Sequence, residues 1–143
     1  MSVEHILSGK GRDVVTIAPD CTLGEAAQIL NQRRIGAVVV VDGGGAVLGI
    51  ISERDVVRAI AENGDKALAD QVSSRMTRKV VTCVPTCSVN DIMGLMTDGK
   101  FRHVPVLDSG KLCGIVSIGD VVKHRLAEIE SEHRAMRDYI ATA

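Results

Sequence analysis

The 143-residue chain contains an internal repeat, which limits its possible folds more than any other feature. The segment Val14–Thr22 (VVTIAPDCT) returns 66 positions later as Val80–Ser88 (VVTCVPTCS). After a one-residue deletion the correspondence continues, and Gly49–Val57 (GIISERDVV) falls on Gly114–Val122 (GIVSIGDVV). Because repeated sequence builds repeated structure, the chain is predicted to hold two copies of one folded unit.

Each copy has the same predicted order of elements. A short β-branched segment ends at a proline, and Thr22 or Ser88 then provides the N-cap of an amphipathic helix. Two apolar strands follow, which are Ala37–Val41 and Val47–Ile51 in the first copy, and another helix begins after Ser52. This β-α-β-β-α unit is too small to bury its own sheet comfortably, so the two copies are expected to bury each other.

The repeat divides the chain into four parts. We expect one copy in residues 8–63 and the other in residues 76–127. The connecting segment 64–75 is predicted to contain a short helix near Leu68–Val72, and residues 128–143 are predicted to form a C-terminal helical extension. The predicted fold class is α/β, in a mixed α+β arrangement.

The charge and hydropathy patterns exclude two kinds of partner. Basic and acidic residues nearly balance, 17 against 18, and Phe101 and Tyr139 are the only aromatic residues, which argues against direct nucleic-acid binding. No apolar run reaches the roughly 20 residues that span a membrane, and the first residues do not resemble a secretion signal. We therefore expect a cytoplasmic protein.

The cysteines and histidines do not form a recognisable chemical site. No Cys-x-x-Cys pair is present, so the cysteines are interpreted as reduced packing residues, with redox sensing through Cys83, Cys87 or Cys113 as a weaker alternative. The histidines outside the repeated motifs are scattered, at His5, His124 and His133, so no metal site is predicted. No catalytic residue or catalytic cofactor is predicted either.

Two equivalent aspartates have a pattern suited to binding a sugar. Asp55 and Asp120 each follow a serine by three residues, in the first turn of a helix. A carboxylate can accept hydrogen bonds from both vicinal hydroxyls of a ribose, and the helix N-terminus attracts phosphate. A single aspartate at such a position is ordinarily a helix cap. The duplication, with the serine in both copies, favours a ligand-binding role.

The repeated motifs together resemble a tandem pair of cystathionine-β-synthase (CBS) domains, the arrangement called a Bateman module. The resemblance rests on the Thr-x-x-Pro segments Thr16–Pro19 and Thr82–Pro85, the strand Arg102–Val106, and the Gly-h-h-Ser-x-x-Asp segments Gly49–Asp55 and Gly114–Asp120, where h is apolar. It covers most of the chain. It implies two sheets related by a pseudo-twofold axis, with two clefts in which family members bind adenosine compounds.

The resemblance also implies which residues form each cleft, because the aspartate of one repeat faces the first strand of the other. The residues expected in the first cleft are Ser52, Arg54, Asp55, Thr82, Cys83, Arg102 and His103. The residues expected in the second cleft are Ser117, Asp120, Thr16, Ile17, Gly36 and Ala37. For His103, a place in the core or on the surface is an equally good interpretation.

The two expected clefts differ in charge. Arg54 precedes the first aspartate, whereas Gly119 precedes the second, and Arg102 and His103 correspond to uncharged Gly36 and Ala37. The first cleft is therefore predicted to bind the more highly charged ligand.

Beyond the second repeat, the pattern predicts a long helix with an apolar seam. Its apolar and histidine positions are spaced 4, 3, 4, 3 and 4 residues apart, at Val122, Leu126, Ile129, His133, Met136 and Ile140. Such a heptad-like stripe needs a partner surface, so a homodimer is expected.

The sequence thus predicts a non-catalytic regulatory module. It is expected to bind an adenine nucleotide, AMP foremost and ADP, ATP or NAD(H) next, and to signal the energy state to an unidentified protein by a change of conformation. Two alternatives stay open. The protein could be a structural adaptor with degenerate clefts that acts through its C-terminal helix, or a small enzyme.

Overall fold

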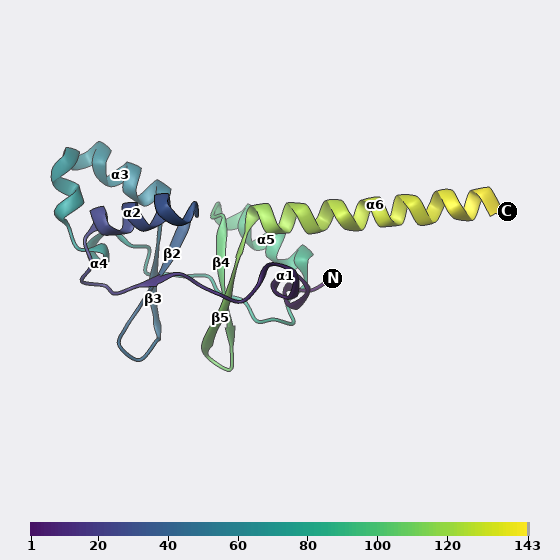
Figure 1. The fold of residues 1–143 in the computed structure, drawn as a ribbon, viewed down its shortest axis with the longest axis horizontal. Helices are drawn as coiled ribbons and strands as arrows, with labels where there is room; N and C mark the ends of the chain where they lie inside the picture. Colours follow the sequence, from purple (N-terminus) through teal and green to yellow (C-terminus); the bar gives the residue numbers. More distant parts are fainter. Residues whose placement is uncertain (143) are drawn as a thin grey trace.

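The computed structural model describes residues 1–142, and its elements follow the repeat (Figure 1). The first half contains α1 (Val3–Lys10), β1 (Thr16–Ile17), α2 (Leu23–Arg33), β2 (Ala37–Val41), β3 (Val47–Ser52) and α3 (Glu53–Asn63). The second half contains the 3₁₀ helix η1 (Gly64–Ala69), α4 (Val72–Arg75), α5 (Val89–Gly99), β4 (His103–Asp108), β5 (Lys111–Ser117) and α6 (Ile118–Thr142). The predicted α+β class and the predicted hairpins are confirmed.

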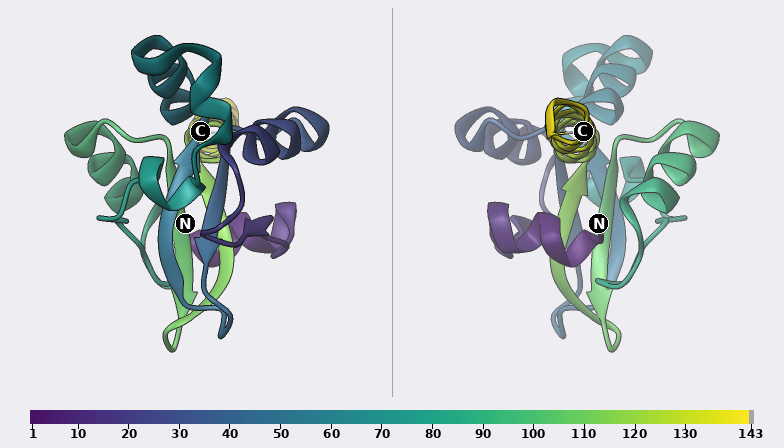
Figure 2. Two further views of the ribbon diagram at one scale, coloured as in Figure 1. Left: turned by 90° about the vertical axis from the view of Figure 1, so that its left-hand side faces the viewer. Right: turned by 90° about the vertical axis from the view of Figure 1, so that its right-hand side faces the viewer.

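The strands form two small sheets, one in each repeat. In the first, β1 pairs parallel to β2, and β2 pairs antiparallel to β3. In the second, β4 and β5 form an antiparallel pair, and the segment equivalent to β1 adds a single bridge between Cys83 and Val106. The hairpins lie side by side, with α2, α3 and α4 on one side and α1, α5 and α6 on the other (Figure 1). The view along the long axis shows one hairpin behind the other (Figure 2).

The predicted N-caps at Thr22 and Ser88 are confirmed, and the two caps differ in their hydrogen bonding. Thr22 and Glu25 form a reciprocal capping box at the start of α2. At the start of α5, Ser88 accepts a hydrogen bond from the backbone N–H of Asp91 at 3.0 Å, but the aspartate does not return the contact. The shorter side chain of aspartate reaches the N-cap N–H less readily than glutamate does, which explains the difference.

Each repeat completes its core with a helix from outside its own sequence copy. Helix α1, which precedes the first repeat, buries Val3, Ile6 and Leu7 in the core of the second repeat. Helix α4, which precedes the second repeat, buries Val72 in the core of the first. Each of these two helices therefore packs in the core of the repeat that it does not directly precede, and we call α1 and α4 the crossed helices.

The two crossed helices occupy equivalent positions. The N–H of Val3 donates to the carbonyl of Cys87 at 2.9 Å, and the N–H of Val72 donates to the carbonyl of Cys21 at 2.7 Å. Position 3 thus corresponds to position 72, an offset of 69 residues (72 − 3).

A pair of glycines allows the crossed helices to approach the sheets. A Cβ on Gly114 would lie 2.6 Å from Leu7 Cδ2, and a Cβ on Gly49 would lie 2.6 Å from Met76 Sδ. Because real Cβ atoms do not make contacts this short, the glycine of each Gly-h-h-Ser motif is needed for packing.

The connecting segment between the repeats and the C-terminal helix complete the fold. The connecting segment forms η1 and α4 rather than one helix near Leu68–Val72, because Asp70 is extended and interrupts the helical hydrogen bonding. Helix α6 is 25 residues long and projects away from the sheets (Figure 1). Among residues 1–142, no helix is long and apolar enough to cross a membrane.

Candidate ligand-binding clefts

Asp55 is held at the start of α3 by the serine that precedes it. Its Oδ2 accepts hydrogen bonds from the backbone N–H of Ser52 at 2.8 Å and from the Ser52 hydroxyl at 3.0 Å. The side chain is 7% exposed, and Oδ1 lies 3.6 Å from a guanidinium nitrogen of Arg58. The carboxylate therefore uses one oxygen as a helix cap while its other oxygen faces a cation.

A cavity of about 500 Å³ lies beside Asp55, where the two repeats meet. Ligand pockets in proteins commonly range from about 300 to 1,000 Å³. Both repeats and the connecting chain contribute to its lining, which comprises Gly36, Ile50, Ser52–Asp55, Arg58, Thr77, Lys79–Val81 and Gly99–His103. A ligand in this cavity would touch both repeats at once.

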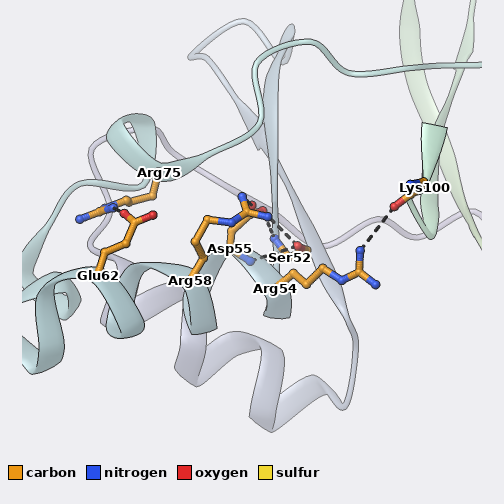
Figure 3. A network of polar contacts seen from close by, with 7 residues as sticks. All are labelled: Ser52, Arg54, Asp55, Arg58, Glu62, Arg75 and Lys100. Atoms are coloured by element: carbon orange, nitrogen blue, oxygen red, sulfur yellow. Dashed lines mark hydrogen bonds and ion pairs between the residues drawn. The ribbon is translucent and has the colours of Figure 1, made fainter.

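The cavity has an excess of positive charge. Five permanently or normally cationic side chains line it, against the two carboxylates of Glu53 and Asp55. Arg54 extends from the first repeat and donates to the Lys100 carbonyl of the second repeat at 3.5 Å (Figure 3). Cations gathered around one acidic acceptor suit a ligand that combines a diol with phosphate groups.

His103 lines the first cavity at the junction of the two repeats. It is half-buried, and a Cβ on Gly36 would lie only 3.0 Å from its Cε1 atom. Burial lowers the pKa of His103 below 6.5, while Glu53 raises it, Lys10 lowers it, and Asp120 and Arg102 act weakly in opposite directions. The imidazole is therefore close to charges from both repeats, although it lines the first cavity.

The second aspartate repeats the capping geometry but has a different neighbour. The N–H of Ser117 donates to Asp120 Oδ2 at 2.9 Å, and Lys10 Nζ donates to the same oxygen at 2.7 Å. Burial by itself would raise the pKa of Asp120, but the hydrogen bonds from Lys10 and Ser117 outweigh it and hold this pKa below its usual value. The second carboxylate is therefore already engaged by an ammonium of the same chain.

The structure gathers most, but not all, of the residues expected in the first cleft. Ser52, Arg54, Asp55, Arg102 and His103 line the cavity. Gly36, expected in the second cleft, lines it as well.

Thr82 and Cys83 lie outside the lining of the first cavity, which takes Val80 and Val81 from this segment instead. The N–H of Cys83 donates to the Pro105 carbonyl at 3.1 Å, and this contact draws Cys83 into the core. The chain therefore passes the cavity two residues earlier than expected.

Three residues expected in the second cleft lie instead in the strands of the first repeat. Thr16 is exposed and pairs with Val39, while Ile17 is buried in the first core and pairs with Val40. Ala37 lies at the buried start of β2, beside Gly36. Val14, the equivalent of Val80, precedes these strand residues, and within residues 1–142 no hydrogen bond joins Thr16 or Ile17 to Asp120.

Burial makes Cys83 a poor redox sensor. Its desolvation, with Cys87 and Cys113 nearby, raises the pKa of the Cys83 thiol to about 12. Because the thiolate is the reactive form, this cysteine is chemically inert near neutral pH.

Sequence reasoning missed three cations of the first cavity. Arg58 lies one helical turn after Asp55, so its spacing could have revealed it. Lys100 ends α5 in a left-handed conformation, and Lys79 comes directly before the segment 80–83, which we call the lead-in segment. Neither lysine has a sequence spacing that would have indicated its place in the cavity.

Comparisons with known proteins agree with this architecture. The CBS domain family profile matches residues 4–62 and 69–127. The crystal structure of the CBS-domain containing protein ATU1752 from Agrobacterium tumefaciens has a TM-score of 0.85 and 52% identity, and the match covers 87% of this chain and 92% of that one.

Two similar CBS structures contain adenosine compounds. One is the CBS domain protein PAE2072 from Pyrobaculum aerophilum complexed with AMP, with a TM-score of 0.75, 27% identity and coverage of 84% of this chain and 89% of that one. The other is the CBS domain pair of protein MJ0100 in complex with 5-methylthioadenosine and S-adenosyl-L-methionine, with a TM-score of 0.80, 27% identity and coverage of 90% and 98%.

Proposed function

Because this chain belongs to the CBS-domain family, with a domain match in each of its repeats, we propose that it is a non-catalytic regulatory module that binds an adenine nucleotide between them. The observation that carries the proposal is the cavity of about 500 Å³ that brings Asp55 together with cations from both repeats. The adenosine compounds in the structures of PAE2072 and MJ0100 support the ligand class.

In this proposal, the ribose lies against Asp55 and the phosphates lie among the surrounding cations. Oδ1 of Asp55 accepts from the ribose diol, and the Ser52 hydroxyl can rotate to release part of Oδ2. Arg54 and Lys100 are cations on opposite repeats, and both line the cavity. For the module as a whole, AMP is the foremost ligand. The first cleft favours ADP, ATP or NAD(H), because their additional phosphate charge meets its additional cations.

Regulation would follow from the position of the ligand between the repeats. A nucleotide that contacts both repeats favours the relative arrangement that it binds more tightly, and it shifts the population by that difference in affinity. The changed surface would be read by a separate protein. A cytoplasmic location stays a prediction from the sequence.

The projecting helix α6 supports a further part of the proposal, assembly into a homodimer. Its exposed apolar side chains follow the predicted seam, at Val122, Leu126, Ile129, Met136 and Ile140. A second copy of the same helix supplies a matching stripe. The same observation favours the alternative of an adaptor that acts through α6, and nucleotide binding distinguishes the two functions.

Substitution of each aspartate tests the binding proposal. Asp55→Asn keeps an oxygen for the helix cap but removes the carboxylate, so it should weaken ADP and ATP binding roughly tenfold or more. Asp120→Asn should affect these two nucleotides less than AMP. Isothermal titration calorimetry with AMP, ADP and ATP measures the losses, with Asp138→Asn on exposed α6 as the control.

Two results would contradict the proposal in different ways. Equal losses in both variants with every nucleotide would remove the difference between the clefts. A wild-type protein that binds none of the three nucleotides would favour the adaptor.

A further inference from the structure

Lys10 occupies the carboxylate of the second cleft. Its ammonium donates to Asp120 Oδ2 at 2.7 Å and to the carbonyl of Ile115 at 2.9 Å. Since the N–H of Ser117 also donates to Oδ2, that oxygen has no lone pair left for a ribose hydroxyl. A ribose that needs both oxygens of Asp120 must first displace Lys10.

The first cleft has a lysine near the corresponding part of the chain. Counted from the paired positions Val3 and Val72, Lys10 falls on Lys79, although α1 extends to Lys10 whereas α4 already ends at Arg75. Lys79 lines the first cavity, and in the described part of the chain its ammonium forms no hydrogen bond or ion pair. One lysine is therefore bound to its cleft aspartate, and the other lines its cavity without such a contact.

The side chain of Lys10 has the freedom to leave Asp120. Lys10 has a flexible four-carbon stem, and its side chain is 33% exposed, so it can swing without disturbing the core. Arg102 and His103 are the other cationic or chargeable groups whose charges act near this point, and Glu53 is the other carboxylate. Moving the ammonium onto an anion would leave Asp120 free to accept hydrogen bonds.

We propose that Lys10 makes the second cleft select phosphorylated over unphosphorylated adenosine, because it blocks Oδ2 of Asp120 in the free protein and pairs with the phosphate of a bound nucleotide. This inference rests on the proposed function and adds a specificity-determining residue to it. Adenosine must break the Lys10 contacts and offers the ammonium no substitute. AMP breaks the same contacts and supplies a phosphate in their place.

Lys10→Met provides the test because it removes the ammonium but keeps an unbranched side chain at the end of α1. Adenosine affinity at the second cleft should rise roughly fivefold to tenfold, because no charged hydrogen bond has to be broken. AMP affinity should rise less or fall, so the ratio of AMP to adenosine affinity should drop by about the same factor.

Amide chemical shifts can follow the two clefts separately in one titration. The N–H of Gly119 reports on the second cleft and the N–H of Arg54 on the first, and AMP and adenosine are added to separate samples. The matched variant Lys79→Met should weaken AMP at the first cleft without strengthening adenosine there. Lys111→Met, at the exposed start of β5, should change neither cleft.

The outcomes separate this inference from the proposed function. If neither reporter of the wild-type protein responds to AMP, the nucleotide-binding proposal fails. If AMP binds but Lys10→Met leaves the affinity ratio at Gly119 unchanged, or weakens adenosine, the role of Lys10 is wrong. Lys10→Gln should reproduce Lys10→Met, and matching thermal melts of both variants exclude a folding defect as the cause.

Discussion

At the scale of single residues, His103 is the group on which charges from both repeats act. It packs against Gly36 of the first repeat, and its pKa responds to Glu53 on one side and to Lys10 and Asp120 on the other. An imidazole held neutral by burial changes its charge readily when a nearby anion arrives. Phosphate of a nucleotide in the first cavity, which His103 lines, would favour its protonated form.

The lowered pKa of His103 predicts how stability changes with pH. The unfolded chain binds the proton more tightly than the folded one, so the contribution of neutral His103 is complete above about pH 6.5 and is lost as the pH falls toward its folded pKa. His103→Gln should therefore lose less stability than the wild type between about pH 7 and pH 5. Urea unfolding at several pH values measures this difference.

An exposed histidine provides the control for that experiment. His133→Gln on α6 removes a histidine that is exposed, so it should keep the wild-type pH dependence. Parallel curves for the wild type and His103→Gln would show that His103 titrates alike in the folded and unfolded chains.

The residue scale also shows what the sequence could and could not predict about the site. The Ser52–Asp55 spacing is enough to indicate the helix cap that the structure contains, because a cap depends on contacts three residues apart. The ligand-binding role of Asp55 stays a prediction. The approach of Lys10 to Asp120 spans 110 residues and follows from the crossing of α1, which no local pattern records. The placement of Thr82 and Cys83 was set by backbone pairing of the lead-in segment with β4, a tertiary contact.

At the scale of elements, α6 differs most from its counterpart α3. The two helices begin with the same Ser-x-x-Asp cap, yet α3 ends at Asn63 after 11 residues while α6 continues for 25. In α3 the chain reaches Gly64 at φ 69°, a conformation that glycine adopts easily, and it turns into η1. No glycine or proline follows in α6, so the helix continues past the domain.

Truncation after Leu126 tests whether α6 holds two copies together. Because the exposed stripe from Ile129 to Ile140 has no partner within residues 1–142, its loss should convert a dimer into a monomer of about half the mass. Light scattering coupled to size-exclusion chromatography measures the mass. Arg134→Ala, which lies off the apolar stripe, should leave the dimer intact, and a truncated protein that still elutes as a dimer would place the interface elsewhere.

At the scale of the whole molecule, the crossing of α1 and α4 joins the two repeats into one fold. Each core contains a helix that precedes the other copy in sequence, so stability depends on segments that look peripheral along the chain. The sequence predicted the pair of mutually buried units. It could not show which repeat receives each helix, because an amphipathic stretch of this length fits either equivalent surface.

Ile6→Ala measures the contribution of the terminal helix. Ile6 is fully buried in the core of the second repeat, so the substitution should cost about 2–5 kcal/mol of unfolding free energy. Ser8→Ala, on the exposed face of the same helix, should change stability by less than about 0.5 kcal/mol. Equal urea midpoints for the two variants would mean that α1 detaches readily from the second repeat.

The crossed helices bear on how a chain of this kind could arise by gene duplication. A polypeptide with a single copy would present a docking groove that its own leading helix, by analogy with α1 and α4, fills only in a neighbouring copy. Two such polypeptides would form a domain-swapped dimer by exchanging their N-terminal helices. Joining the two genes end to end would then preserve every contact of that dimer within one continuous molecule.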